Sequence, residues 1–325
     1  MKLQLLIPQF NETDEVMRPM LDSIRTQQGV DLKNDIEVII GNDGSDTKLS
    51  EGLLGSFPFP IRYVLFNHSG LPGTRAHLFD MATADYVMFC DADDMFLTNL
   101  ALYTIFAFTD KDCDALVVDF MEEVIDRKTG HSIFFPHKKD STFVHGKVYR
   151  RQFLIDNNIV WHPDVKCHED SGYNCLALKV AKNVKHCQIP LYLWKWREGS
   201  ICRKDPLYVP KTYTRMIYSN SWLVKDFMDR GMVREAKYYV AMLVYGTYYM
   251  LNKRIWLDPM NAKYRYETEK CFRDYYRKHQ TLFLSVDPKM RNRIIAGTKR
   301  RVLGEGVLLE QFTFDEWIRH IEEME

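Results

Sequence analysis

The segment YVMFCDADDMF (Tyr86–Phe96) passes abruptly from apolar to acidic residues. Four residues of strand character run directly into three acids, Asp91, Asp93 and Asp94. Carboxylates repel one another and are costly to remove from water, so folding alone gives little reason to gather them at the end of a buried strand. The segment therefore indicates a strand whose end presents carboxylates to a positively charged ligand.

Strand-like runs also precede this segment, at Lys2–Pro8, Ile36–Asp43 and Ile61–Asn67. All but the last are nearly continuous apolar runs, which are typical of parallel strands covered on both faces. Helical patterns lie between the strands, the clearest over Leu71–Ala84. This alternation predicts an α/β fold, with a Rossmann-like, mostly parallel sheet flanked by helices. Ligands bind such sheets at the carboxyl ends of the strands.

The pattern changes after Phe106. ALVVDF reads as a strand, the next residues as a hairpin turning at Lys128–Gly130, and Cys187–Ser200 again as a strand. From about Pro206 the chain is helical in pattern, which predicts an α/β domain over 1–205 and a helical C-terminal region over 206–325. Lys and Arg minus Asp and Glu give 23 − 29 = −6 for the first region and 21 − 15 = +6 for the second. The two regions are therefore expected to face different partners.

Composition narrows the class of protein. A formal net charge of zero argues against a wholly basic nucleic-acid binder. The seven cysteines include no C-x-x-C pair, which favours a reducing cytoplasm over a disulfide framework or a zinc site. The N-terminus does not resemble a signal peptide. The longest uncharged run in the second region, Tyr238–Asn252, has 15 residues, whereas a membrane span needs roughly 18 or more. We therefore expect a cytoplasmic protein without a transmembrane segment, in which this run forms a buried helix.

Asp91-Ala92-Asp93 is a D-x-D motif, the first candidate for chemistry. In an extended segment alternate side chains share a side, so both carboxylates can face one ligand. Two hard oxygen donors suit Mg²⁺ or Mn²⁺. The alternative, which is favoured for an isolated motif, is a solvated turn in which Asp94 caps a following helix. A dehalogenase-type phosphatase is disfavoured, because Met95 stands where that class carries Thr or Val.

Three further segments have a structural and a functional interpretation each. GNDGSD (Gly41–Asp46) is an ordinary turn or a contact to a base or ribose. CHED places Glu169 and Asp170 before a helical run, where they are either helix-terminus acids or a general base. WKWREGSICR contains Arg197, Ser200 and Arg203, which form either a solvated cationic edge or a diphosphate clamp. The individual motifs do not decide between these interpretations.

The order of the motifs does. LLIPQFNE, GNDGSDT, GLPGTRAHLFDMATADYVMFCDADD, VHGKVYRRQFLIDNNIVW, CHED and WKWREGSICR resemble, in the same order, the motifs of glycosyltransferase family 2. Asn42 stands where the family usually has Asp, and His77 where it usually has Asn. The resemblance covers roughly Lys2 to Lys204. It implies a GT-A fold and an inverting sugar transfer from a nucleoside diphosphate sugar that needs Mn²⁺ or Mg²⁺.

The resemblance also implies roles for individual residues. Asp93 would ligate the metal and Asp91 would hold the ribose or the metal's water shell, with Glu198 as a weaker candidate for a further metal ligand. Pro8, Glu12 and Asp43 would contact the base and ribose, and Arg75 would sit beside Asp91 or the diphosphate. Arg197 or Arg203 would offset charge on the leaving diphosphate, with Ser200 beside them. Asp170 would deprotonate the acceptor hydroxyl.

The donor is expected to be a UDP-sugar, because uridine is the commonest nucleoside in the family and Asp43 could accept its imide N–H. The acceptor stays open between a glycan, a lipid-linked precursor, a polymer and nucleic acid. The cations of the run Arg291–Arg301 indicate an anionic acceptor, or else a solvated helical face, and homo-oligomerisation is a further use for the helical region. The rival functions are a nucleotidyltransferase and a catalytically inactive GT-A-like binding module.

Overall fold

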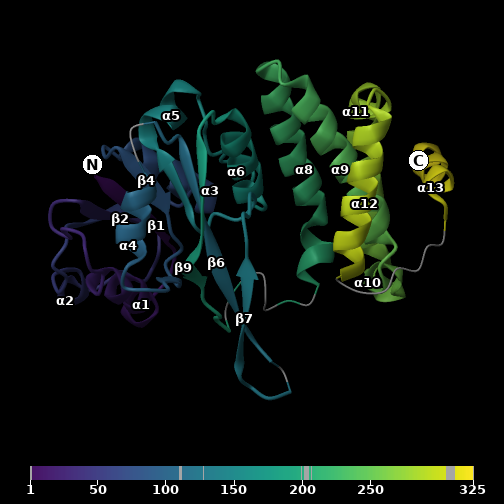
Figure 1. Ribbon diagram of the computed structural model, residues 1–325. Coiled ribbons are helices and arrows are strands. Elements are labelled where there is room, and N and C mark those ends of the chain that lie inside the picture. The colour runs from purple at the N-terminus through teal and green to yellow at the C-terminus, as the bar shows by residue number, and fades with distance from the viewer. Residues whose placement is uncertain are drawn as a thin grey trace. The chain divides into compact units, whose positions relative to one another are not determined.

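The computed structural model describes residues 2–109, 112–126, 128–198, 200, 205, 207–304 and 312–324. The chain divides into two compact units, Met1–Ser200 and Ile201–Glu325 (Figure 1). The division falls five residues before the boundary expected from the sequence. We describe each unit by itself.

The first unit contains, within its described residues, a nine-stranded sheet in the order β3-β2-β1-β4-β8-β6-β9-β5, with β7 paired to β6. The strands are β1 (Leu3–Gln9), β2 (Ile36–Asp43), β3 (Ile61–Phe66), β4 (Tyr86–Phe89), β5 (Met95–Phe96), β6 (Ala115–Ile125), β7 (Ser132–His137), β8 (Lys147–Arg150) and β9 (Val184–Trp194). Strands β3, β2, β1 and β4 are parallel, as the apolar runs of β1, β2 and β4 predict. Beyond β4 the sheet is mixed, and β6 and β7 form the predicted hairpin.

Helices cover the two faces of this sheet. They are α1 (Asp14–Arg25), α2 (Glu51–Leu54), α3 (Leu71–Asp80), α4 (Ala101–Phe108), α5 (Arg151–Asp156) and α6 (Glu169–Val180). On one face α1 and α4 contribute buried side chains such as Met20 and Leu102 to a core shared with β1, β2 and β4. On the other face α3 packs closely against β2. A Cβ on Gly41 would lie 3.0 Å from Leu78 of α3 and 2.7 Å from Phe66, so the glycine permits this approach.

The parallel strands bring their carboxyl ends to one edge of the sheet. Pro8 and Gln9 of β1 lie opposite Gly41 and Asn42 of β2. On the other side of β1, the backbone N–H of Cys90 donates to Leu6 at 3.0 Å. The chain therefore leaves β1, β2 and β4 side by side, and the motifs that follow these strands meet at this edge.

Two local expectations were wrong. Helix α3 ends at Asp80 instead of Ala84, because the buried side chain of Gln4 accepts the backbone N–H groups of Thr83 and Ala84 at 2.7 and 2.8 Å. These bonds draw the chain out of the helix and into β4. Asp94 caps no helix, since strand β5 follows it and pairs with β9.

The second unit is helical in its described residues, as the sequence predicts. It contains α8 (Tyr208–Asp229), α9 (Val233–Leu251), α10 (Arg254–Leu257), the 3-10 turn η1 (Pro259–Asn261), α11 (Ala262–Leu284), α12 (Pro288–Gly304) and α13 (Phe314–Glu323). The run Tyr238–Asn252 lies largely in α9, and most of its side chains are buried. Among the described residues, no helix combines the length and apolarity that a membrane crossing requires.

Candidate active site

The three acids after β4 have three different environments. Asp91 and Asp93 are partly exposed, at 30% and 24%, and each forms an ion pair with an arginine. Asp94 is completely buried. Only Asp91 and Asp93 are therefore accessible to a ligand, which agrees with the alternation expected for a D-x-D motif.

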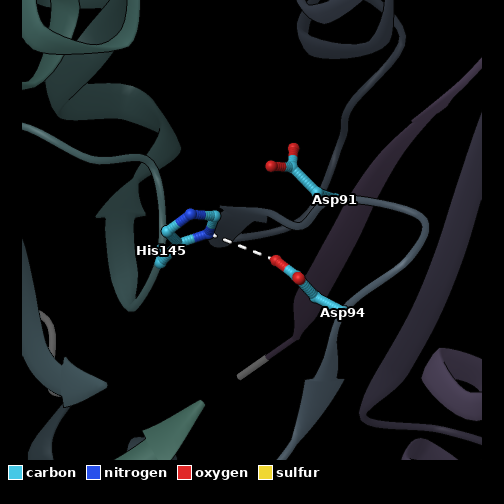
Figure 2. A group of neighbouring side chains, drawn as sticks. All are labelled: Asp91, Asp94 and His145. Atoms are coloured by element: carbon cyan, nitrogen blue, oxygen red, sulfur yellow. Dashed lines mark ion pairs between the residues drawn. The ribbon is translucent and has the colours of Figure 1, made fainter. Parts of the chain in front are cut away.

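Asp94 is held by the neighbouring strand. Its carboxylate accepts hydrogen bonds from the Tyr192 hydroxyl at 2.9 Å and from the Lys195 backbone N–H at 3.0 Å. The Nδ1 atom of His145 lies 3.3 Å from the same carboxylate (Figure 2). Burial raises the pKa of Asp94 well above its usual range and lowers the pKa of His145 to about 4. The shift at His145 favours a neutral imidazole, and the contacts of Asp94 tie the D-x-D loop to the end of β9.

Arg75 joins two acidic motifs that lie far apart in the sequence. Its guanidinium is buried on α3 and donates to Asp91 at 2.9 Å and to Glu169 at 2.9 Å. The guanidinium carbon also lies 4.9 Å from the ring centre of Trp161, a cation–π geometry. One buried cation thus bridges the D-x-D and E-D segments, with an aromatic ring against it. Removing the Arg75 guanidinium would leave both carboxylates without the cation that compensates them.

Asp170 lies in the first turn of α6, next to Glu169. The preceding residue, His168, is the N-cap and has a left-handed backbone with φ of 58°, which turns the chain sharply into the helix. Burial and the adjacent Glu169 raise the pKa of Asp170 to about 7, while Arg75 acts in the opposite direction. A carboxylate with a pKa close to neutral can accept a proton from a reacting group and release it again at physiological pH.

Asp93 belongs to a second ion-pair group. The Nε atom of Arg197 lies 2.9 Å from Asp93, and an Nη atom lies 3.6 Å from Glu12. Glu12 follows β1, and burial raises the pKa of its carboxyl group. Arg197, the arginine expected to bind the diphosphate, therefore pairs with Asp93, the expected metal ligand. If a divalent ion bound Asp93 and a diphosphate bound Arg197, the ion pair between the two side chains would be replaced.

Asp43 has few acceptor positions left. It is 3% exposed, and its carboxylate accepts the backbone N–H groups of Ser69 and Gly70 at 2.7 and 2.9 Å and the Ser69 hydroxyl at 3.2 Å. The Nδ1 atom of His68 lies 2.9 Å from it. Because an ionised carboxylate offers about four lone-pair positions, a base N–H would have to displace one of these contacts. In this structure Asp43 anchors the loop that leads into α3.

The remaining predicted site residues, Pro8, Ser200, Glu198 and Arg203, differ in burial and in their contacts. Pro8 is buried in β1 at the carboxyl edge. Ser200 closes a turn in which its backbone N–H donates to Arg197 at 3.1 Å. Glu198 is exposed and does not belong to the one metal-capable group found among the described residues, which consists of Asp91, Asp94 and His145. Arg203 lies outside the described residues.

The carboxylates of the site fit a hard divalent cation. Asp91 and Asp93, two residues apart, both offer accessible carboxylate oxygens. Mg²⁺ and Mn²⁺ prefer such oxygen donors. In the group of Asp91, Asp94 and His145, by contrast, both oxygens of Asp94 already accept protein hydrogen bonds. We therefore regard this second group as a structural connection.

Four further residues complete the site, of which the sequence analysis named only Glu169, and not as a partner of Arg75. Glu169 is the partner of Arg75, Trp161 packs on it, and His145 faces Asp94. Phe10 follows β1, is 48% exposed and has its ring centre 4.9 Å from that of His68. All four residues stand within the quoted motif segments, but the spacing of the motifs carries no signal for their contacts. Beneath the site Cys90 is completely buried, and burial raises the pKa of its thiol.

Comparison with known proteins agrees with this geometry. The profile of "Glycosyl transferase family 2" matches residues 5–166. The uncharacterised glycosyltransferase EpsJ of Bacillus subtilis (strain 168) is 22% identical over 219 residues, which cover 61% of this chain. The chain spans only 62% of the length of that relative. From the profile match, the present chain belongs to glycosyltransferase family 2.

Solved structures show the same fold over the whole chain. TarS of S. aureus, residues 1–349 in complex with UDP, has a TM-score of 0.62 and 15% identity, with 99% of this chain and 90% of that chain covered. The complex of the same protein with UDP-GlcNAc has a TM-score of 0.53 and 17% identity, with 99% and 91% covered. The fold is therefore GT-A with a helical C-terminal region.

Proposed function

We propose that the protein is a metal-dependent inverting glycosyltransferase, which moves a sugar from a nucleoside diphosphate sugar to an acceptor hydroxyl. The observation that carries the proposal is the position of Arg75, which contacts Asp91 and Glu169 at 2.9 Å each. It joins Asp91, one of the two carboxylates suited to the donor's metal, with the segment that contains the Asp170 carboxyl group of pKa about 7. This connection supports one shared site over an isolated turn and an unrelated helix terminus.

In this proposal the donor diphosphate lies at the carboxyl edge of the parallel strands. Asp93 and Asp91 would hold Mn²⁺ or Mg²⁺, which when bound supplies positive charge to the diphosphate. Arg197 leaves its pairing with Asp93 and Glu12 and donates to the diphosphate oxygens. Arg203 and Ser200 are assigned to the same group only by the family resemblance, and Glu198 stays a weaker candidate ligand.

The nucleoside is assigned to the ends of β1 and β2, beside Pro8, Glu12 and Asp43. The exposed ring of Phe10 supports this assignment, since a flat aromatic surface suits a base. We favour UDP, which the resemblance suggests and which is bound in structures of the similarly folded TarS. Asp43 then acts chiefly by holding the loop before α3, unlike the direct base contact expected from the sequence.

Asp170 is the proposed general base. The acceptor oxygen attacks the anomeric carbon from the face opposite the diphosphate, and its proton passes to the Asp170 carboxylate. The bond from the anomeric carbon to the diphosphate oxygen breaks, and its electrons leave with the diphosphate. In-line displacement inverts the configuration at the anomeric carbon. General-base assistance of this kind contributes about 10²–10⁴-fold to a rate.

The helical unit is the proposed acceptor side. Helix α12 presents the exposed cations Arg293, Lys299, Arg300 and Arg301. Their density supports an anionic acceptor, such as a phosphate-containing polymer, a lipid head group or modified nucleic acid. Packing between copies of the chain is the second use we consider for this unit.

The test is a screen of UDP-, GDP- and TDP-sugars for hydrolysis by the full chain with Mn²⁺ and with excess chelator. The proposal expects sugar release from a UDP-sugar with Mn²⁺ only. Pyrophosphate-forming turnover of a nucleoside triphosphate with a sugar phosphate would instead identify a nucleotidyltransferase. Binding of a nucleotide sugar with no turnover of any donor would identify an inactive binding module.

A further inference from the structure

A hairpin of the first unit exposes apolar side chains that the proposed chemistry does not use. Strands β6 and β7 form it, and it extends beyond the other elements of this unit (Figure 1). Ile133, Phe134 and Phe135 of β7 are 40%, 47% and 49% exposed. The other large apolar side chains that are exposed in the described part of the chain stand singly in the sequence, which is ordinary for a protein surface. Three in succession on one strand indicate a surface that a partner covers.

The three side chains emerge on both faces of the hairpin. In the register of β6 and β7, Ile133 lies opposite Val124 and Phe134 lies opposite Glu123. Because successive strand residues point to opposite faces, Ile133 and Phe135 share one face and Phe134 lies on the other. A flat protein surface could cover only one of these faces. A fluid surface that receives β7 edge-on covers both.

Positive charge stands at both ends of the apolar stretch. Residues 126–139 contain four Lys and Arg residues and one Asp, a net charge of +3. Lys128 lies in the turn of the hairpin, whereas Lys138 and Lys139 follow the end of β7. All three lysines are exposed. The apolar side chains and the cations are therefore accessible along the same strand.

The nearest acids lie on the inner strand of the hairpin. Glu122 and Glu123 belong to β6, which is paired on its other side to β9. Glu122 contacts His137 at 2.9 Å, and Glu123 accepts the Ser132 hydroxyl at 2.6 Å. Both acids are partly buried. The outer edge of β7 thus combines aromatic and aliphatic side chains with cations, which is the combination that binds the interface of an anionic membrane.

Pairing of β7 with a second copy of the chain fits these features less well. Since positive charge stands at both ends of the strand, a symmetric antiparallel pair would bring like charges together at each end. Pro136 lacks a backbone N–H, and a proline on an edge strand opposes the addition of another strand. The charge and the proline therefore favour a lipid surface over a second copy.

We propose that β7 binds edge-on to the surface of a membrane that contains anionic phospholipid. The three apolar side chains enter the interfacial region, and the lysines at the two ends of the strand lie at the lipid phosphates. The outer backbone groups of β7 need hydrogen bonds, which the hydrated head-group region supplies and the hydrocarbon does not, so the binding is shallow. The inference goes beyond the proposed function, because this binding requires no donor, acceptor or metal.

Co-sedimentation of the full chain with vesicles tests the proposal. One set of vesicles contains phosphatidylcholine and phosphatidylglycerol, and the other contains phosphatidylcholine alone. We expect binding to the anionic vesicles that weakens with rising salt, and binding to the neutral vesicles that is weaker by about tenfold or more. Phe134→Ser combined with Phe135→Ser should weaken binding to the anionic vesicles by about tenfold or more. Lys138→Gln combined with Lys139→Gln should weaken it by about fivefold for each charge removed at low salt.

The matched control combines Leu100→Ser with Tyr103→Ser. These two side chains, at α4, are 47% and 52% exposed, so the control removes a similar amount of exposed apolar surface elsewhere on the same unit. Its binding should equal that of the wild type. All the substituted side chains are exposed, and an unchanged Tm shows that each variant is folded.

The absence of saturable binding of the wild-type chain to anionic vesicles overturns the proposal, and so does equal binding to the two kinds of vesicle. Binding that survives both hairpin variants but is lost when Lys299, Arg300 and Arg301 are replaced by Ala places the lipid on α12 and overturns it as well. Analytical ultracentrifugation without vesicles tests the second copy. A wild-type dimer that the variant lacking both phenylalanines fails to form would identify β7 as an interface between copies and overturn the membrane proposal. The donor screen is separate, so its failure and the failure of this inference are distinguishable.

Discussion

Arg75 and Glu169 are separated by 94 residues in the sequence and by 2.9 Å in the structure. Each is supported from a different element, Arg75 from α3 and Glu169 from the first turn of α6. The same guanidinium contacts Asp91, so one buried cation links the first turn of α6 to the D-x-D segment. The proposed base and the proposed donor site are therefore held in one electrostatic network, which makes it the first target for mutation.

Replacing Arg75 by Gln should shift the pH dependence of sugar transfer. The guanidinium lowers the pKa of Asp170, so its loss raises that pKa above about 7, and the rise of kcat/KM with pH moves to higher pH. Loss of one partner from a buried ion pair also costs about 3–5 kcal/mol of stability, which a lower Tm would reveal. Arg75→Lys keeps the charge but cannot bridge two carboxylates in a fork, and should shift the profile less.

Arg62→Gln, on a side chain 39% exposed, is the control. An unchanged pH profile in a folded Arg75→Gln variant would contradict the network.

Replacing Asp170 by Asn preserves shape and removes basicity. Nucleotide binding measured by calorimetry should stay near the wild-type value, while transfer falls about 10²-fold or more. In the wild type, transfer should decline as the pH falls through about 7, because the carboxylate becomes protonated and can no longer accept a proton. Asp164→Asn, a matched change at an exposed acid, should alter neither quantity. Wild-type transfer by Asp170→Asn would reduce Asp170 to a helix-terminus acid.

Replacing Asp93 by Ala tests the metal. UDP binding in the presence of Mn²⁺ should be lost together with activity, because the diphosphate loses its counter-charge. Excess chelator should abolish the turnover of the wild type. Glu198→Ala separates the two candidate ligands, and the exposed position of Glu198 leads us to expect only a small effect. Full activity in chelator would exclude a metal-dependent mechanism.

Replacing Phe10 by Ala should weaken UDP binding by about 5- to 150-fold, since stacking of a base on an aromatic ring contributes about 1–3 kcal/mol. Phe10→Tyr keeps the ring and should bind normally. Calorimetry with UDP and with inorganic pyrophosphate distinguishes base from phosphate contacts, because the Phe10→Ala substitution should lower the affinity for UDP and leave the affinity for pyrophosphate unchanged. Equal affinities of Phe10→Ala and wild type for UDP would move the base away from the end of β1.

Replacing Lys299, Arg300 and Arg301 together by Ala should raise the acceptor KM and leave donor hydrolysis unchanged, most clearly at low salt. Phosphate contacts weaken steeply with ionic strength, with a log–log slope near −0.9 per duplex phosphate neutralised. The control removes three other exposed cations of the helical unit, Lys225, Lys270 and Lys278, and hence the same net charge. A wild-type KM for the first triple variant at low ionic strength would leave α12 as a solvated face only.

The sequence predicts the architecture well because the parallel strands are apolar on both faces. Those runs identify β1, β2 and β4 and place the acidic segments at one edge. The errors arise where a side chain overrides a local pattern. The periodicity of Leu71–Ala84 continues past Asp80, but it does not reveal that Gln4, about 80 residues away, accepts the backbone of the following residues.

The sequence locates the motifs of the candidate site, but it does not reveal which side chains pair with one another there. The acids of the D-x-D segment look alike in the sequence, yet Asp94 accepts hydrogen bonds from Tyr192 of β9 and from Lys195, which directly follows β9, while Asp93 pairs with Arg197. These partners lie in or just after β9, and the place of β9 in a mixed sheet cannot be read from apolar periodicity. Asp43 shows the same limit, because its neighbours on the loop before α3 lie 25 to 27 residues further along the chain.

The burial of Cys90 supplies a built-in reporter for this region. The thiol directly precedes Asp91 and has no exposure to solvent, so an alkylating reagent can reach it only when β4 opens. The rate of alkylation therefore follows the free energy of that local opening, which need not equal the free energy of global unfolding. A nucleotide that binds the closed site slows the labelling of this cysteine in proportion to its occupancy. Ligand affinity can thus be read by mass spectrometry, without any assay of turnover.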